Sequence, residues 1–234
     1  MDVSPAASSR SPRPRLLPAA FYDRPVHEVA RDLLGMVLVR VPERGPGPGG
    51  RSAGAAGRGE RLSGRIVEVE AYDGMEDLAC HASKGRTART EPMFGEAGRA
   101  YIYLVYGVHC CLNVVTGPAG HPAAVLIRAL EPLQGRERMV AGGAPPARIA
   151  SGPGRLTRAL RIGLSLNRAD LRAPGGLFIE AGDPVPDEEI LRGPRIGVEY
   201  AGPWARKLWR LGVRGSAALS RPFPGTRAAF RRRR

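Results

Sequence analysis

The segment GRIVEVEAYDG, residues 64–74, constrains the fold more than any other part of the sequence. Apolar and polar residues alternate along it with a period of two, which is typical of a β-strand. In a strand, successive side chains point to opposite faces, and the two sets here are Val67, Val69 and Ala71 against Ile66, Glu68, Glu70 and Tyr72. Two carboxylates and a phenol are therefore expected to share one face of the strand.

This acidic face has two interpretations. On an open sheet surface, Glu68 and Glu70 would be ordinary solvated acids of an edge strand. In a cleft, a single carboxylate can take a proton from water as the water attacks a sugar carbon. A pair about 7 Å apart, which is two strand rises, also fits the acid and base of a sugar hydrolase. The segment alone leaves both interpretations open.

Other segments predict a sheet around this strand. Those rich in β-branched and aromatic residues are 36–41, 62–72, 101–106, 108–116, 123–130 and 177–180. An amphipathic helix is expected between Asp23 as N-cap and Gly35 as C-cap, and two more helices over 134–141 and 156–162. We therefore predict one domain of the α/β (α+β) class, with a mixed, largely antiparallel β-sheet surrounded by helices.

The domain boundaries follow from composition. The chain of 234 residues is long enough for one domain with a buried core. Residues 1–15 and 221–234 are rich in Pro and Arg and are expected to be disordered. Residues 43–60 are rich in Gly, Pro and Arg and are expected to form a flexible loop within a domain that spans 16–220.

Charge indicates the class of partner. The formal net charge is +14, and the body stays basic without the six arginines of residues 221–234. Such a balance suits a polyanion such as DNA, with a merely basic soluble protein as the alternative. No apolar run approaches the ~20 residues of a membrane helix, and the first residues lack the apolar core of a signal peptide. We expect a cytoplasmic, nucleoid-associated monomer with no membrane partner.

The segment AYIYLVYGVHCCLNVV, residues 100–115, predicts a β-hairpin that turns at Tyr106 and Gly107. An aromatic side chain at a hairpin tip is poorly placed for a core, but it can enter a base stack where a nucleotide has been extruded. Tyr101 and Tyr103 share a face, and core packing is the simpler interpretation for both. Arg128 interrupts an apolar strand, so it needs a carboxylate, a phosphate or ordered water.

A metal site is not expected from the cysteines and histidines. Cys80, Cys110 and Cys111 lack CxxC spacing. His81 follows Cys80 and His109 precedes Cys110, and neighbours on a strand point to opposite faces and do not easily close one site. Neither adjacent cysteine lies at an evident helix start that would activate it as a nucleophile. We predict no metal and no cofactor.

Residues 16–220 resemble, in order, the alkyladenine (3-methyladenine) DNA glycosylase family in its bacterial form. The resemblance is carried by GRIVEVEAYDG, by Glu76, Asp77 and His81, and by YIYLVYG, CLN, VLIRALEP, SGPGRLTRAL, RIGVEYAG and WARK. The segment LWRLGVRGS, residues 208–216, matches poorly at its start, and no contact is carried onto it. The resemblance implies a metal-free, single-domain α/β fold with a protruding β-hairpin that intercalates into DNA through the minor groove.

The resemblance also implies catalytic roles. Glu70 corresponds to the general base, and Arg128 and the main-chain carbonyl of Ile196 to the groups that hold the attacking water. Tyr106 corresponds to the intercalating tip.

The same resemblance implies a pocket for the flipped purine. Tyr72, His81 and Tyr103 correspond to residues that stack on the base and read it. Asn113 corresponds to the residue that clashes with the exocyclic amine of normal guanine.

We therefore expect a monofunctional DNA glycosylase of base excision repair. It would flip alkylated purines, of the 3-methyladenine and 7-methylguanine class, out of double-stranded DNA and hydrolyse the N-glycosidic bond to leave an abasic site. An alkylated purine is already cationic and leaves without prior protonation, so one carboxylate suffices. Lys84 and Lys207 are not evidently poised as nucleophiles, so no Schiff base is expected. The alternatives are a sugar hydrolase that uses Glu68 and Glu70, and a non-catalytic protein that binds distorted DNA.

Overall fold

A computed structural model describes residues 14–42, 60–139 and 144–225 of the chain. The predictions of disorder for 1–13 and 226–234 and of a flexible loop over 43–59 concern residues outside these ranges. The helices and strands are α1 (Ala19–Tyr22), α2 (Val26–Leu33), β1 (Val37–Arg40), β2 (Leu62–Asp73), β3 (Ala100–Val105), β4 (His109–Val115), β5 (Ala123–Gln134), α3 (Pro153–Ala159), β6 (Leu177–Glu180), β7 (Ile190–Gly193) and β8 (Arg210–Val213). Short 3-10 helices cover His81–Lys84, Glu91–Phe94, Arg136–Arg138, Pro146–Arg148, Leu164–Leu166, Asp187–Glu189 and Glu199–Arg206.

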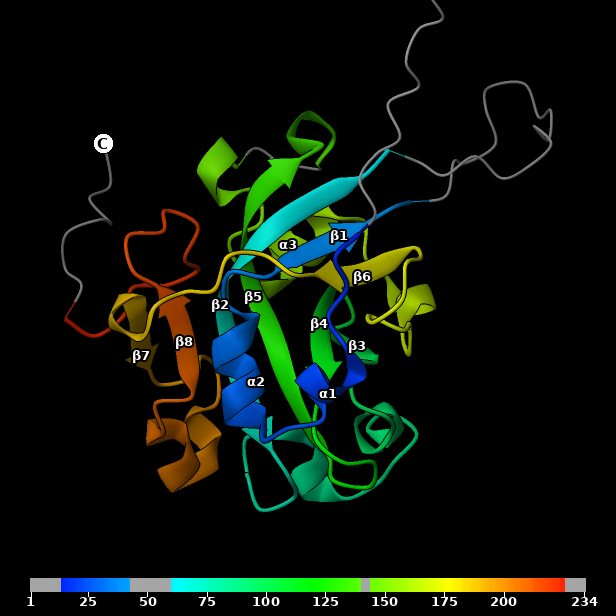
Figure 1. Cartoon of the computed structure of the whole chain (residues 1–234). Helices are drawn as coiled ribbons and strands as arrows, with labels where there is room; N and C mark the ends of the chain where they lie inside the picture. Colours follow the sequence, from blue (N-terminus) through cyan, green and yellow to red (C-terminus); the bar gives the residue numbers. More distant parts are fainter. Residues whose placement is uncertain (1–13, 43–59, 140–143, 226–234) are drawn as a thin grey trace, which may run out of the picture.

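Within the described residues, eight strands form one sheet in which every pairing is antiparallel (Figure 1). The main order is β3-β4-β5-β2-β1-β6. The long strand β2 pairs with β5 along one edge, and its other edge is divided between β1 at residues 62–65 and β8 at residues 68–70. The predicted single domain with a largely antiparallel sheet is confirmed, and the acidic strand lies inside the sheet rather than at its edge.

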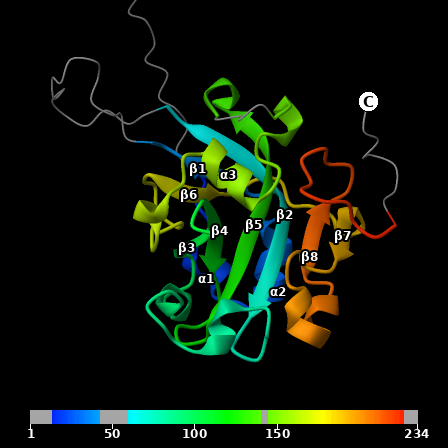
Figure 2. The ribbon, with the colours of Figure 1, turned by 180° about the vertical axis from the view of Figure 1, so that it is seen from behind.

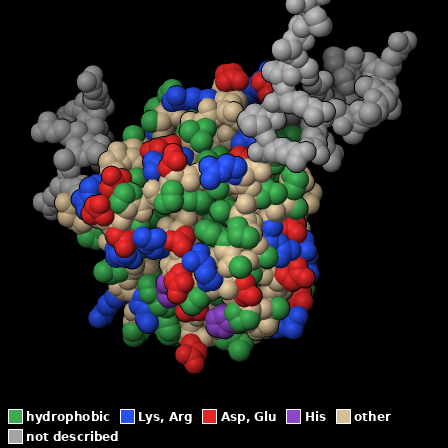
Figure 3. Space-filling view, in the orientation of Figure 1, with side chains coloured by type: hydrophobic (Ala, Val, Ile, Leu, Met, Phe, Trp, Pro, Cys, Tyr) green, Lys and Arg blue, Asp and Glu red, His purple; other side chains and the backbone are tan. Residues whose placement is uncertain are grey.

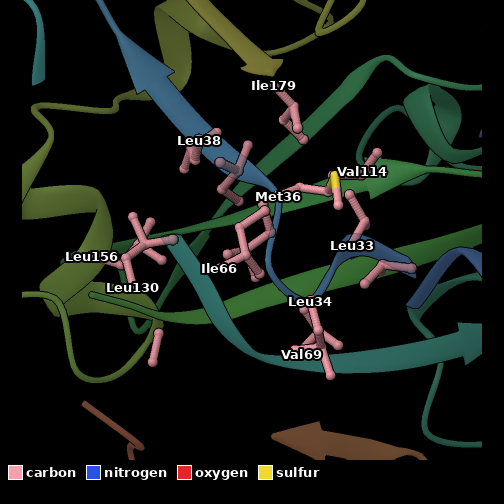
Figure 4. Close-up of a cluster of buried hydrophobic side chains, with 14 of the residues drawn as sticks. Leu33, Leu34, Met36, Leu38, Ile66, Val69, Val114, Leu130, Leu156 and Ile179 are labelled. Carbon is pink, nitrogen blue, oxygen red and sulfur yellow. The ribbon is translucent and has the colours of Figure 1, made fainter. Parts of the chain in front are cut away.

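Helices cover both sides of this sheet. Figures 1 and 2 view the molecule from opposite sides, with α2 in front of the sheet in the first and α3 in front in the second. The helix α2 packs on β2 and β5, and α3 packs on β4 and β5. The buried residues of α2 recur at helical spacing and are Val26, Val29, Ala30 and Leu33. Figure 4 shows Leu33 among aliphatic side chains of β1, β2, β4, β5 and β6 in the main core.

A β-bulge interrupts the alternation along β2. Ile66 pairs with Leu130, and Glu68 pairs with the adjacent Ala129, so Val67 is an extra residue in the strand. Ile66 and Val67 both lie in the main core. The prediction that Ile66 shares a face with Glu68 is therefore wrong, because the bulge turns the strand between them.

A second irregularity places an extra residue in β5. Glu68 pairs with Ala129 and Val69 pairs with Ile127, so Arg128 has no residue opposite it in β2. A bulge bends its strand and re-aims the local side chain. The Arg128 side chain reaches both Glu68 and Glu70.

Short elements account for most differences from the sequence-based prediction. The helix expected over 134–141 is absent from the described part of that range, where β5 runs to Gln134 and only the 3-10 helix Arg136–Arg138 follows. Gly135 between them has a left-handed φ of 68°, which ends the strand. The four-residue elements α1, β7 and β8 were not predicted, since so few residues show no period. No helix in the described ranges is long and apolar enough to cross a membrane.

The described C-terminal segment folds back onto the sheet. Phe223 is only 3% exposed and packs with Leu191 and Leu219. The tail predicted to be disordered from residue 221 thus includes residues that belong to the fold as far as 225.

Candidate active site

Strand register brings the candidate residues to one face of the sheet. Tyr101 of β3 lies opposite Asn113 of β4, which lies opposite Leu126 of β5, which lies opposite Glu70 of β2. Directly opposed residues of antiparallel strands share a face. Glu70 is in turn opposed by Arg210 of β8. The acidic strand and the aromatic strand, far apart in sequence, therefore contribute to one surface.

A cavity of about 540 Å³ opens on this face. Its volume lies within the range of about 300–1,000 Å³ that proteins use for small organic ligands. The lining residues are Tyr72, Ala79, Cys80, His81, Arg89, Met93, Tyr101, Tyr103, Leu104, Val105, Tyr106, His109, Cys111, Asn113, Ala124, Leu126, Arg128, Pro153, Gly154, Ile196, Gly197, Val198 and Tyr200. Every residue with an implied role lines the cavity except Glu70.

Glu70 is fully buried and is connected to the cavity wall through three hydrogen-bond donors. Its Oε1 accepts from the backbone N–H of Ile196 at 2.8 Å. Its Oε2 accepts from the Tyr72 hydroxyl at 2.9 Å and from Arg128 Nη1 at 3.1 Å. The main-chain group of Ile196 that contacts Glu70 is thus the N–H, whereas the implied role concerns its carbonyl. The arrangement fixes both carboxylate oxygens.

Arg128 satisfies the expectation that a buried guanidinium needs a carboxylate, since it has two. Its Nη1 donates to Glu70, and its Nε donates to Glu68 Oε1 at 3.1 Å. Burial acts to lower the pKa of Arg128, but the charges of Glu70 and Glu68 outweigh it and raise this pKa above the ordinary value. Arg128 is therefore a fixed cation between two buried carboxylates.

The aromatic wall opposite Glu70 is built on β3 and on the 3-10 helix that begins at His81. His81 Nδ1 lies 3.0 Å from the Tyr101 hydroxyl, and its ring meets that of Tyr103 edge-on with centroids 4.4 Å apart. Burial, together with the positive charges of Arg89 and Lys84, lowers the pKa of His81 to about 4. The imidazole is therefore neutral near pH 7 and can both donate and accept a hydrogen bond.

Asn113 lies in the wall with its amide held in one orientation. The side chain is 3% exposed, and Nδ2 donates to the Tyr101 carbonyl at 3.0 Å. Tyr101 is itself 2% exposed, as expected of a packing residue.

Tyr106 is at the tip of the β3–β4 hairpin. The Val108 N–H donates to the Val105 carbonyl at 3.1 Å, which closes a tight turn around Tyr106 and Gly107. Both central residues have positive φ, 52° and 69°, as in a type I′ turn. Glycine adopts this conformation freely, but it strains a tyrosine, and the Tyr106 side chain is 94% exposed. A strained and exposed aromatic residue at a cavity rim is consistent with a binding role.

Sequence reasoning missed a buried ion pair behind the cavity. Arg195 forms a two-pronged salt bridge with Asp77, and both side chains are fully buried. The Arg195 guanidinium lies 4.7 Å from the Tyr72 ring centroid and 4.8 Å from that of Trp209. Arg195 thus braces Tyr72 and immediately precedes Ile196. Both partners lie within the quoted motifs, but no spacing rule indicates that they meet.

In the described ranges, no group of three His, Cys, Asp or Glu side chains is arranged to hold a metal ion. The three cysteines are free thiols. Burial raises the pKa of the Cys111 thiol, which lines the cavity, to about 11. This thiol is therefore protonated near pH 7 and is a poor nucleophile.

Comparisons with known proteins show the family of the chain. The family described as Methylpurine-DNA glycosylase (MPG) matches residues 53–217. Proteins named "Putative 3-methyladenine DNA glycosylase" are similar along nearly their whole length. Those of Myxococcus xanthus and Methanocella arvoryzae are each 50% identical, over 90% of this chain and 97% and 98% of theirs. That of Legionella pneumophila (strain Corby) is 43% identical over 88% of this chain and 99% of its own. The chain therefore belongs to the methylpurine-DNA glycosylase family, whose enzymes are hydrolases of N-glycosyl bonds in DNA.

Proposed function

We propose that this enzyme flips an alkylated purine out of double-stranded DNA into the cavity and cleaves its N-glycosidic bond with a water activated by Glu70. The observation that carries the proposal is the fully buried Glu70 carboxylate, held by three donors at the wall of an aromatic cavity. The names of the relatives support an alkylated purine as the substrate class.

The hydrogen bonds of Glu70 suit a base that acts on one water. Donors on both oxygens hold the carboxylate in one orientation. A carboxylate offers about four acceptor positions. Ile196, Tyr72 and Arg128 occupy three, which leaves one position for a water molecule. Once the purine begins to leave, the negative charge also stabilises the positive charge that develops on the sugar.

The cavity offers three means of recognising a damaged purine. The faces of Tyr72 and Tyr103 attract a cationic, electron-poor base more strongly than a normal one. The neutral His81 can exchange a hydrogen bond with the edge of the base. Asn113, with its amide fixed, narrows the site against the exocyclic amine of guanine.

The surroundings of the cavity suit a duplex. Tyr106 would fill the space left by the flipped nucleotide. On α3, Arg155 and Arg158 are exposed, next to Pro153 and Gly154 of the cavity wall, and can contact phosphates. The α2 side of the molecule, by contrast, shows acidic and basic side chains interspersed (Figure 3). One chain supplies all these groups, so a monomer suffices.

A monofunctional reaction is proposed because no lysine amine of the described residues lines the cavity. The sequence contains two lysines, Lys84 and Lys207, and neither lines the cavity. Lys207 Nζ instead lies 4.1 Å from the ring centroid of Trp204. The product would be an abasic site in an uncut strand.

The test is incubation with duplexes that each carry one base: 7-methylguanine, 3-methyladenine, hypoxanthine, ethenoadenine or a normal purine. Alkali then cuts the strand at abasic sites. We expect the strand to be cut at alkylated purines, and to be cut only after alkali treatment. With Glu70→Gln we expect no cuts. Normal turnover by Glu70→Gln, or strand cleavage without alkali, would contradict the proposed mechanism.

A further inference from the structure

Glu68 is buried as deeply as Glu70, but its surroundings differ. It is 0% exposed and does not line the cavity. Its Oε1 accepts from Arg128 Nε at 3.1 Å, Arg210 Nη1 at 3.0 Å and the Ser220 hydroxyl at 2.7 Å, and its Oε2 accepts from the Ser220 N–H. A carboxylate bound in this way cannot approach a substrate. This placement argues against the alternative of a sugar hydrolase, which would need Glu68 as a second carboxylate at the substrate.

The same contacts connect Glu68 to two of the groups that hold Glu70, which are the Arg128 guanidinium and the backbone N–H of Ile196. The first connection is direct, because Arg128 donates to Glu68 through Nε and to Glu70 through Nη1. The fork of a guanidinium is rigid and planar, so fixing one nitrogen orients the others.

The second connection runs through Arg210. Arg210 donates to Glu68 through Nη1 and to the Pro194 carbonyl through Nε, at 3.0 Å each. Pro194 lies two residues before Ile196, whose N–H binds Glu70. Arg210 is itself held by the C-terminal segment, through the Pro222 carbonyl at 2.9 Å and the Phe223 ring 3.8 Å away.

We propose that Glu68 is a positioning residue for the glycosylase reaction, which fixes Arg128 and the 194–196 segment so that their donors meet Glu70 in one geometry. This inference rests on the proposed function, since it assumes that Glu70 activates the water. Glu68 does not touch the substrate and acts only through Arg128 and Arg210.

The charges of the cluster make this role measurable. Glu68 and Glu70 are balanced by Arg128 and Arg210, so the four side chains are together neutral. Replacing Glu68 by Gln leaves a net positive charge beside Glu70. The added positive charge makes Glu70 a weaker acceptor of the proton from water. Other groups that influence Glu70 are Arg195 with Asp77, Tyr72, Tyr103 and Cys111, and none of them changes in this variant.

The experiment compares full-length Glu68→Gln, Ser220→Ala and Glu180→Gln with the unmodified enzyme. Glu180 is the matched control, because it forms a two-pronged ion pair with Arg61 at the other end of the sheet and does not line the cavity. The readouts are the single-turnover rate constant on a 7-methylguanine duplex from pH 5 to 9, affinity for an abasic-site duplex, and thermal melting.

For Glu68→Gln we expect a fall of about tenfold in the single-turnover rate constant and a changed pH profile, with affinity within about twofold of the original. Ser220→Ala removes one hydrogen bond to Glu68 and the acceptor of Arg128 Nη2, but no charge. It should lower the rate constant to a smaller extent, leave the pH profile unchanged, and answer the question if Glu68→Gln does not fold. Glu180→Gln should change neither rate nor profile.

A lower melting temperature with an unchanged rate per folded molecule and an unchanged pH profile would overturn the proposal, since a purely structural carboxylate behaves in that way. Glu70→Gln is measured alongside. If it is inactive while Glu68→Gln is normal, the role of Glu68 alone fails. If Glu70→Gln is active, the proposed function fails.

Discussion

The Tyr72 hydroxyl donates a hydrogen bond of 2.9 Å to Glu70 Oε2, which joins the aromatic wall of the cavity to the buried carboxylate behind it. The two residues are neighbours on one face of β2. Burial, followed by the negative charge of Glu70, raises the pKa of Tyr72 well above its ordinary value. The phenol therefore keeps its proton and remains a donor across the working pH range. Tyr72 is thus expected to act on the base and on Glu70 together.

Replacing Tyr72 by Phe separates its expected contact with the base from its hydrogen bond to Glu70. The ring remains available for stacking, but Glu70 loses one donor. A hydrogen bond to a charged group contributes about 1.5–3 kcal/mol, so the single-turnover excision rate should fall by about tenfold or more. Affinity for an abasic-site duplex should hardly change. If affinity fell as much as the rate, the hydroxyl would contribute to DNA binding instead.

Tyr106→Ala tests the hairpin tip. Truncating a buried aromatic residue to Ala costs about 3–5 kcal/mol of stability. Tyr106 is 94% exposed, so its substitution should cost little stability. The exposed Tyr106 side chain makes few packing contacts, so the substitution should leave the fold and the turn in place. Excision should fall most for lesions in stable base pairs and least opposite mismatches, where unstacking is already easy.

Thermal melting and single-turnover excision on one preparation of Tyr106→Ala provide the check. An unstable variant with normal excision per folded molecule would identify Tyr106 as a packing residue.

His81 gives a pH prediction. Its pKa in the folded protein is about 4, below the ordinary value of 6.5. Between these values the unfolded chain binds a proton at His81 that the folded protein does not, so stability rises with pH through this window. The stabilisation is complete above about pH 6.5 and is lost as the pH falls toward 4.

NMR titration of the imidazoles provides the direct measurement. His81 should remain neutral at pH 6. In denaturant unfolding, His81→Gln should show a weaker fall in stability between pH 6.5 and 4 than the original protein. An imidazole midpoint near 6.5, or identical slopes for the two proteins, would contradict this assignment.

Two truncations separate folding from DNA binding at the C-terminus. Removal of residues 226–234 takes away five arginines, so binding to all duplexes should weaken about equally and the salt dependence should flatten. Removal of 221–234 also deletes Phe223 and the carbonyls that hold Arg210, and should in addition lower the melting temperature.

Melting curves and binding titrations across a salt series distinguish the two truncations. A change in lesion preference after the shorter truncation would show that the terminal arginines belong to the site rather than to general phosphate binding.

Much of the framework could be read from local sequence. The alternation from Glu68 to Tyr72 and the β-branched and aromatic runs of β3, β4 and β5 predicted the central strands, and helical spacing predicted α2. Tyr106 and Gly107 marked the turn of the hairpin. These features depend on backbone geometry with a short period, which a single segment records. The implied site residues came from the resemblance, and their roles remain predictions.

The contacts of Glu70 were decided only by tertiary structure. Two bulges, one in β2 and one in β5, turn Ile66 into the core and bring Arg128 to the carboxylates, and no local pattern indicates a bulge. Arg210 and Ser220, which hold Glu68, lie more than a hundred residues from it in a region with little sequence signal. The sequence by itself therefore determined the central strands and the candidate carboxylates. Which carboxylate stands at the cavity and which is enclosed behind it depends on long-range pairing, because burial and charge balance are properties of the assembled sheet.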